Sequence, residues 1–225
     1  MGVSISLKES IKKNKLIAIM RNISEDYALS AAQALYDGGV RLVEVTFNQA
    51  AADSGITSTY RAIQSIKYAC PDDMYVGAGT VLTEPQMRIA INAGAEYIVS
   101  PNIEPELIKI QKKLGLVSIP GALTPTEIVL AHSSGADFVK IFPADIMGLS
   151  YAKAIMAPLN HIPMIAVGGV NLENLTSFLE AGFCGVGIGG NILKQEFLLE
   201  KDFDAISKTA KKYTDIIEQY NANNK

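Results

Sequence analysis

The stretch SEDYALSAAQALYDGGVRLVEVTFN, residues 24–48, joins a segment with helical spacing to a short apolar run. In its first part, apolar residues recur at positions i, i+3, i+4 and i+7 up to Gly38, which predicts an amphipathic helix that ends on glycine. The run that follows, LVEVTFN (42–48), alternates in side-chain character with a period of two, as a β-strand does. The stretch therefore predicts one helix followed by one strand.

The same unit recurs, because eight short apolar runs alternate along the chain with segments of helical spacing or turn residues. Eight such units imply parallel strands, and a closed α/β barrel, the (β/α)8 TIM barrel, requires that number. An open doubly wound sheet is the alternative. Residues 1–225 are expected to form a single domain with an extra helix at the N-terminus and, from residue 203, a terminal helix with a frayed polar tail. The predicted strands are LIAIMR (16–21), LVEVTFN (42–48), YVGAGTV (75–81), YIVSPN (97–102), LVSIPGA (116–122), FVKIFPA (138–144), MIAVGGV (164–170) and GVGIGGNI (185–192).

Composition excludes several classes of protein. The 225-residue chain is 48% hydrophobic and 19% charged, and its net charge of −3 provides no overall basic field for nucleic acid or an anionic membrane. No segment has the roughly 18 uninterrupted apolar residues of a membrane span. Cys70 and Cys184 belong to no metal-binding pattern and are expected to be reduced thiols of a cytoplasmic protein. The opening MGVSIS fits the loose N-myristoylation pattern, but a chance match to so short a pattern is the preferred interpretation.

Strand alternation places two charged side chains inside the predicted barrel. Glu44 shares the inward face of its strand with Thr46 and Asn48, and Lys140 shares the inward face of FVKIFPA with Phe142. Arg21 and Thr80 stand at the ends of two further runs. Since parallel strands of a barrel present their C-terminal ends at one mouth, Arg21, Glu44, Thr80 and Lys140 are predicted to converge there.

A lysine inside a barrel has two explanations. It forms a structural ion pair, most simply with Glu44, or it loses its proton because burial disfavours the ammonium form. A neutral amine is a nucleophile that can attack a ketone and form a Schiff base. A buried carboxylate of raised pKa, for which Glu44 is the candidate, can move the protons that this chemistry needs. Both explanations can hold, with Glu44 and Lys140 paired in the resting enzyme and Glu44 moving protons during turnover.

Two glycine-rich strand ends, VGGVN (167–171) and GIGGN (187–191), predict a phosphate site. In such barrels, backbone N–H groups after the last two strands often bind phosphate, and glycine lets the backbone approach the anion. A tight turn is the alternative. The predicted site residues are Gly168, Gly169, Gly190 and Asn191.

Other polar residues are weaker candidates. His132 and His161 fall in helical or connecting segments, so a histidine base or a metal site is not expected. Asp145 lies near the predicted mouth and could position water, although a helix cap or a solvated loop acid is preferred. We expect no metal and no cofactor.

The motifs GGVRLVEVTFN, VGAGTVLT, IVSPN, IPGALTPTE, DFVKIFPA, AVGGVNLENL and GIGGNIL together resemble, in order, the class I 2-keto-3-deoxy-6-phosphogluconate (KDPG) aldolase family, which includes keto-hydroxyglutarate and phosphogalactonate aldolases. The resemblance implies a homotrimeric, metal-independent (β/α)8 enzyme with Lys140 as the Schiff-base lysine and Glu44 as the acid/base. It also implies that Thr80 binds the pyruvyl carboxylate, that Pro101 and Phe142 line the pocket, and that Gly168 and Gly169 bind phosphate.

The chain departs from the phosphogluconate enzymes of this family at three positions. Asn48 stands where they usually have an arginine that binds the substrate carboxylate, and Val167 and Asn191 stand where they often have hydroxyl residues near the phosphate. The phosphogalactonate relatives are similar to this chain in having an amide there and an arginine at the end of the first strand. Arg21 is therefore expected to contact the substrate carboxylate. The activity is expected to depend less on the substrate phosphate than it does in an enzyme with hydroxyl residues at positions 167 and 191.

These observations predict a cytoplasmic aldolase that cleaves a 2-keto-3-deoxy-6-phospho sugar acid into pyruvate and glyceraldehyde 3-phosphate. The prediction includes 4-hydroxy-2-oxoglutarate as a possible second substrate. The partners are small molecules, with neither nucleic acid nor membrane among them. The alternatives are a phosphate-binding barrel isomerase or epimerase and a non-catalytic protein that binds sugar phosphates.

Overall fold

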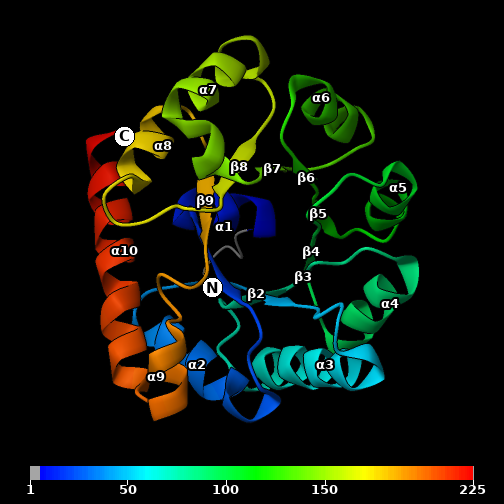
Figure 1. The fold of residues 1–225 in the computed structure, drawn as a ribbon, viewed down its shortest axis with the longest axis vertical. Helices are drawn as coiled ribbons and strands as arrows, with labels where there is room; N and C mark the ends of the chain where they lie inside the picture. The colour runs from blue at the N-terminus through cyan, green and yellow to red at the C-terminus, as the bar shows by residue number, and fades with distance from the viewer. Residues whose placement is uncertain (1–5, 225) are drawn as a thin grey trace.

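The computed structural model describes residues 6–224, and for residues 52 and 53 the backbone alone. Parallel strands alternate with helices and form a ring that the helices surround (Figure 1). The N-myristoylation pattern MGVSIS lies almost wholly outside the described residues. The strands are β1 (Leu16–Met20), β2 (Leu42–Thr46), β3 (Tyr75–Gly79), β4 (Tyr97–Val99), β5 (Val117–Ile119), β6 (Gly121–Ala122), β7 (Val139–Ile141), β8 (Met164–Val167) and β9 (Gly185–Ile188). The helices are α1 (Leu7–Asn14), α2 (Glu25–Asp37), α3 (Ala52–Ala69), α4 (Glu84–Ala93), α5 (Pro105–Lys113), α6 (Pro125–Ser133), α7 (Ala144–Leu159), α8 (Leu175–Glu180), α9 (Gln195–Glu200) and α10 (Phe203–Asn223).

The strands form a barrel of eight positions, one of which is divided between two short strands. The strand order is β5-β4-β3-β2-β1-β9-β8-β7-β6, with parallel pairing throughout. Pro120 separates β5 from β6, because proline has no N–H to donate to the ladder. Its carbonyl still accepts a hydrogen bond from Lys140 N (2.8 Å), and Ser118 O accepts one from Phe138 N (3.2 Å), so this run also closes the barrel. The predicted TIM barrel is confirmed, with the fifth predicted strand split in two.

Strand alternation sorts the apolar side chains into two cores. The core between strands and helices contains Val43, Val45 and Ile141, and the core inside the barrel contains Ile19 and Phe138. Because every strand is covered on both sides, the one-residue alternation decides which side chains can reach the barrel interior. The predicted inward direction of the even positions of β2 and β7 agrees with this division.

Helix α1 closes the N-terminal end of the barrel and lies behind the strands in Figure 1. It begins with a capping box, in which the Ser6 and Glu9 side chains each accept a hydrogen bond from the other residue's backbone N–H. Ile11 is 1% exposed and belongs to the core inside the barrel. The chain enters β1 directly after Lys15, whose carbonyl accepts a hydrogen bond from Val186 N (2.7 Å). The predicted N-terminal helix is thus confirmed and acts as a plug.

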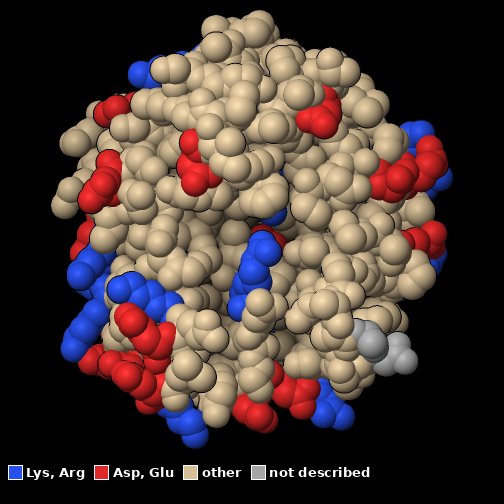
Figure 2. Space-filling model, in the orientation of Figure 1, with Lys and Arg blue, Asp and Glu red and all other residues tan. Residues whose placement is uncertain are grey.

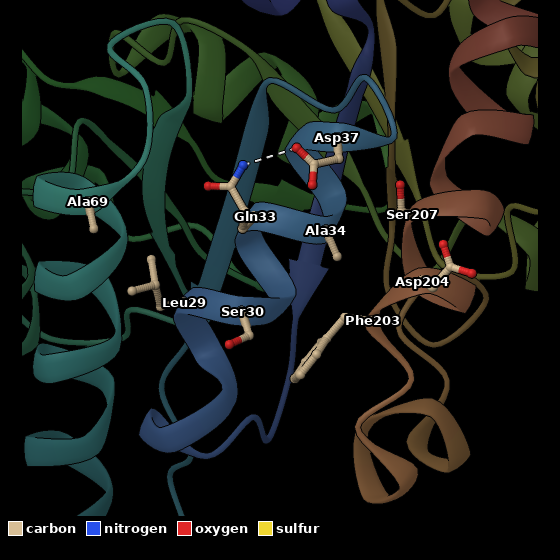
Figure 3. Close-up of a pocket in the computed structure, with 9 residues that line it drawn as sticks. All are labelled: Leu29, Ser30, Gln33, Ala34, Asp37, Ala69, Phe203, Asp204 and Ser207. Atoms are coloured by element: carbon tan, nitrogen blue, oxygen red, sulfur yellow. Dashed lines mark hydrogen bonds between the residues drawn. The ribbon is translucent and has the colours of Figure 1, made fainter.

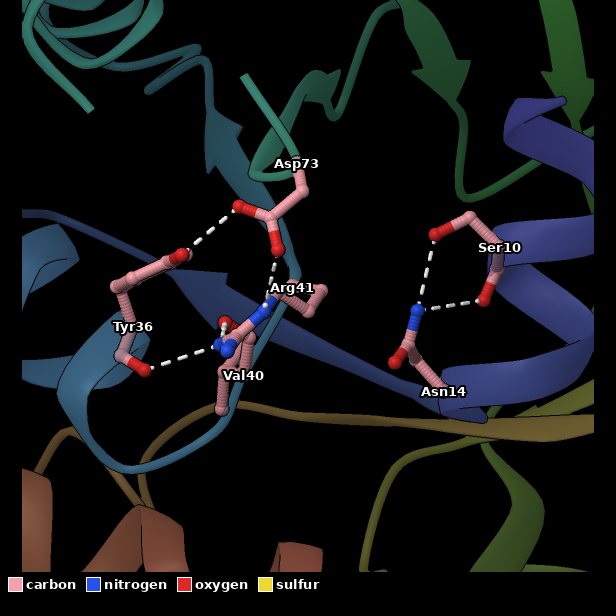
Figure 4. Close-up of polar contacts among 6 residues, drawn as sticks. All are labelled: Ser10, Asn14, Tyr36, Val40, Arg41 and Asp73. Atoms are coloured by element: carbon pink, nitrogen blue, oxygen red, sulfur yellow. Dashed lines mark hydrogen bonds and ion pairs between the residues drawn. The ribbon is translucent and has the colours of Figure 1, made fainter. Parts of the chain in front are cut away.

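Polar contacts fasten the same end of the barrel from outside (Figure 4). The Asp73 carboxylate accepts hydrogen bonds from Tyr36 Oη (2.8 Å) and Arg41 Nε (3.1 Å). Arg41 Nη1 also donates to the carbonyls of Tyr36 (3.0 Å) and Val40 (2.9 Å). In α1, Asn14 Nδ2 donates to the carbonyl of Ser10 (2.9 Å). The contacts of Arg41 and Asp73 join the segments that precede β2 and β3, so they serve stability at the end opposite the mouth.

The C-terminal tail is more ordered than expected, because α10 continues to Asn223. Thr214 Oγ1 donates to Gly38 O (2.8 Å), and Asn221 Nδ2 donates to Lys13 O (3.0 Å). A Cβ at position 38 would lie 2.6 Å from Ala210 Cβ, so glycine permits the close approach of α10 to the end of α2. The prediction of a frayed tail was wrong within the described residues. Across residues 6–224, no helix is both long enough and apolar enough to cross a membrane.

Candidate active site

The C-terminal ends of the parallel strands meet at one end of the barrel, here called the mouth. Figure 2 shows a hollow at the centre of the face toward the viewer, with a basic side chain over it and acidic and basic atoms deeper. The sequence places Arg21 directly after β1, Glu44 within β2, Thr80 directly after β3 and Lys140 within β7. Three of these strands are neighbours in the barrel, and β7 lies across it.

Lys140 is the central residue of β7, and it lies in the barrel interior with 4% of its surface exposed. Its Nζ lies 4.8 Å from the centre of the Phe142 ring, within the range of a cation–π contact. Burial lowers the pKa of Lys140 from its ordinary value, the Glu44 charge acts in the opposite direction, and the Arg21 charge lowers it further. Burial is the largest of these effects, so it shifts the balance of Lys140 toward the neutral, nucleophilic amine.

Glu44 is the second buried ionisable group, and its side chain is 3% exposed. Burial raises the pKa of Glu44, while the positive charges of Lys140 and Arg21 act in the opposite direction. The carboxylate lies against β3 at Gly79, where a Cβ would overlap its oxygen. Glycine at that position therefore makes the room in which Glu44 sits.

Glu44 and Lys140 interact through their charges without direct contact. In the described part of the chain, neither side chain forms a hydrogen bond or a direct ion pair with the other. Burial raises the pKa of Glu44 and lowers the pKa of Lys140, so in each case burial favours the uncharged form. This arrangement does not support a structural ion pair as the sole role of the lysine. A carboxyl group of raised pKa and a lysine of lowered pKa in one barrel interior are instead suited to transferring protons at a carbonyl carbon.

The glycine-rich loops line a cavity of about 320 Å³ at the mouth, which Phe142 also lines. Gly168 and Gly169 have φ angles of 97° and 67°, which favour glycine. Asn191 Nδ2 donates to Val170 O (2.8 Å), so its amide joins the two loops. The cavity brings together six of the predicted residues, namely Arg21, Phe142, Gly168, Gly169, Gly190 and Asn191.

Five predicted residues do not line that cavity. Lys140 and Glu44 are buried in the barrel interior, and the other three follow the ends of strands. Thr80 lies in the turn after β3 with a φ of 56°. Asn48 is exposed after β2, and its Oδ1 accepts a hydrogen bond from Ala50 N (3.0 Å), so it stabilises a turn. Pro101 follows β4, and its carbonyl oxygen would lie 2.5 Å from a Cβ at Gly121.

Tyr97 is a residue of the barrel interior that our sequence reasoning missed. It is fully buried, and its Oη donates to Val43 O (2.5 Å), which the absence of a side chain at Gly77 permits. Burial, followed by the Glu44 charge, raises the pKa of Tyr97 well above its ordinary value. The signal in the sequence was the pair of glycines at alternate positions of VGAG, because two vacant inward positions on one strand leave room for large neighbours.

The weaker candidates lie elsewhere. The rings of His132 and His161 form an edge-to-face pair with centres 5.8 Å apart, and both residues are exposed on the helical layer. Asp145 lies in the first turn of α7, against Gly169. Within residues 6–224, no group of three or more His, Cys, Asp and Glu side chains is arranged to hold a metal ion.

Comparison with known proteins agrees with this geometry. A model of the KDPG and KHG aldolase family matches residues 7–209. The 2-dehydro-3-deoxy-6-phosphogalactonate aldolase of Escherichia coli (strain K12) is 34% identical over 207 residues, which are 92% of this chain and 98% of that protein. A solved structure described as native KDPGal has a TM-score of 0.81 and 33% identity over 91% of this chain and 95% of its own.

A second solved structure is relevant to the chemistry. It is the KDPG aldolase of Legionella pneumophila with pyruvate captured as a covalent carbinolamine, with a TM-score of 0.81 and 26% identity over 92% of this chain and 97% of its own. Since the family model covers most of the chain and similarity to the Escherichia coli enzyme extends over nearly the full length of both, the chain belongs to the KDPG and KHG aldolase family.

Proposed function

We propose that the protein is a metal-independent class I aldolase that cleaves a 2-keto-3-deoxy-6-phospho sugar acid, derived from gluconate or galactonate, into pyruvate and glyceraldehyde 3-phosphate. The observation that carries this proposal is Lys140, a buried lysine of lowered pKa that faces a buried carboxyl group across a barrel mouth. A relative that captures pyruvate as a carbinolamine supports the same chemistry. Cleavage of 4-hydroxy-2-oxoglutarate to pyruvate and glyoxylate belongs to the proposal as a second activity.

The proposed reaction begins with attack of Lys140 Nζ on C2 of the keto acid, which gives a carbinolamine. Glu44 donates its proton to the leaving hydroxyl, water departs, and an iminium ion forms. The iminium accepts the electron pair of the C3–C4 bond, while the Glu44 carboxylate takes the proton of the C4 hydroxyl, which becomes the aldehyde. Glu44 then protonates C3 of the enamine, which regenerates an iminium ion. Water adds to C2 of this ion and gives a proton back to Glu44, and the C2–N bond breaks to release pyruvate and the free lysine. A carboxyl group of raised pKa suits both the donating and the accepting steps.

The residues at the mouth have proposed binding roles. The Arg21 guanidinium can bind the pyruvyl carboxylate with two parallel hydrogen bonds, and Thr80 binds the same carboxylate at the end of β3. Backbone N–H groups of Gly168, Gly169 and Gly190 bind the phosphate. The cavity that these glycines share with Arg21 and Phe142 supports the binding of one ligand that carries both a carboxylate and a phosphate.

The proposal extends to assembly and compartment. We infer a homotrimer from family membership, and a cytoplasmic location from the two cysteines, Cys70 and Cys184, which are free thiols in the structure.

Pyruvate release from the gluconate-derived, galactonate-derived and hydroxyglutarate substrates tests the function. We expect the wild type to cleave at least one phosphorylated substrate and Lys140→Met to fall to the background rate. Lys109→Met, which removes an exposed lysine paired with Glu106 on α5, is the matched control and should keep full activity. Release of pyruvate by Lys140→Met would contradict the mechanism. Binding of phosphorylated substrate by the wild type without any cleavage would indicate a non-catalytic binding protein.

A further inference from the structure

The turn after β3 contains an unusual backbone conformation. Thr80 has a φ of 56°, in the left-handed region that β-branched residues rarely adopt. Such conformations persist only where surrounding contacts hold them, and they are common at ligand sites. The contacts that hold Thr80 are therefore of functional interest.

Each of three successive carbonyl groups in this turn accepts a hydrogen bond from a different residue. Gly79 O accepts from Phe47 N (2.9 Å), as an extension of the pairing between β2 and β3. Thr80 O accepts from the side chain of Gln49 through Nε2 (2.8 Å). Val81 O accepts from the buried hydroxyl of Ser100, after β4 (2.8 Å). The peptide group between Thr80 and Val81 is thus held on both sides, by the Gln49 side chain at its carbonyl and by β4 at its N–H, since Val81 N donates to Val99 O (3.2 Å).

Gln86, in the first turn of α4, orients Gln49. Gln86 Nε2 donates to Gln49 Oε1 (2.8 Å), and Gln86 Oε1 accepts from Leu82 N (2.9 Å). Both ends of each amide are therefore used. The chain of hydrogen bonds runs from the backbone at Leu82 through the two glutamines and returns to the same turn at Thr80, so it ties residues 80–82 into one closed unit.

We propose that Gln49 and Gln86 are positioning residues, which hold Thr80 in its left-handed conformation so that it presents its polar groups to the pyruvyl carboxylate. This inference rests on the proposed function, because it assigns a task to the carboxylate subsite of that reaction. Gln49 is exposed and Gln86 is half-buried. Neither contributes apolar packing to the core, so their main effect is on the conformation of the turn.

The test measures the pyruvate concentration that gives half-maximal trapping of the Schiff base by borohydride. Gln49→Leu and Gln86→Met should each raise this concentration about tenfold, the effect of one lost hydrogen bond. The trapping rate at saturating pyruvate and the inhibition by inorganic phosphate should stay within about twofold of the wild type. The double variant should be no worse than Gln49→Leu, because both residues act through one contact.

Gln33→Leu is the matched control, and it should keep the wild-type pyruvate affinity. Gln33 is an exposed glutamine on α2 whose Nε2 donates to Asp37 Oδ1 (3.0 Å), and it lines a cavity of about 510 Å³ between helices outside the barrel (Figure 3). Wild-type affinity in Gln49→Leu, with normal trapping by the wild type, would overturn the inference and leave the proposed function intact. An equal loss of affinity in Gln33→Leu would also overturn it. Absence of trapping in the wild type would instead refute the proposed function.

Discussion

Gly79→Ala tests whether the position of Glu44 controls the reaction. A Cβ at residue 79 would lie 2.5 Å from Glu44 Cδ and 2.6 Å from Cγ. Non-bonded carbon atoms favour about 3.5 Å or more, so the carboxyl group must move by about 1 Å. A displacement of that size can lower a rate by about 10²-fold, which is about 2.7 kcal/mol in the barrier. We therefore expect kcat for pyruvate release to fall by about two orders of magnitude.

Gly77→Ala is the matched control, because it adds the same methyl group to the same strand two residues earlier. There the Cβ would overlap the Tyr97 ring rather than the Glu44 carboxylate. Both variants should lose about 1–3 kcal/mol of stability from overpacking. Thermal unfolding and steady-state kinetics separate the two effects, with the larger loss of kcat expected in Gly79→Ala. A Gly79→Ala enzyme with a kcat within about threefold of the wild type would refute the reasoning.

Four further predictions concern charge and ligand binding. Glu44→Gln should move the pH profile of Schiff-base trapping to lower pH, since the carboxylate charge raises the pKa of Lys140, whereas Arg21→Leu should move it to higher pH. Arg21→Leu should also raise the pyruvate concentration for half-maximal trapping about tenfold, as expected for a lost charge-assisted hydrogen bond. Lys140→Met should raise the Tm at pH 7, because burial disfavours the protonated lysine in the folded wild type. Between the lowered pKa of folded Lys140 and the ordinary value of 10.5, the unfolded wild type binds more protons than the folded protein, so the stability of the wild type rises with pH. The Tm difference between the variant and the wild type should therefore vanish as pH rises toward 10.5. Substrate without phosphate should lose less kcat/KM here than in a relative with hydroxyl residues at positions 167 and 191, and a complete loss of activity would contradict that prediction.

Strand alternation was sufficient to predict which residues enter the barrel. A parallel strand is buried on both sides, so a side chain such as Lys140 or Glu44 has two well-defined directions, and only one leads to the mouth. Arg21 and the glycines after β8 and β9 were predictable for a related reason, since the ends of parallel strands must meet.

Loops and long-range contacts were less predictable. The division of the fifth strand depends on Pro120, whose ladder bonds can be assigned only when both neighbouring strands are known. Asn48 fell on the inward face by alternation, but β2 ends at Thr46 and its amide then stabilises a turn. The two glutamines that hold Thr80 come from segments 37 residues apart, and no local pattern joins them.

The central claim is that Lys140 forms a covalent intermediate with the keto acid. Borohydride reduction of the wild type in the presence of pyruvate, followed by peptide mass mapping, tests it most directly. The account predicts a single reduced pyruvate adduct on the peptide that contains Lys140, and none on Lys140→Met. An unmodified wild type, or an adduct confined to another lysine, would contradict it.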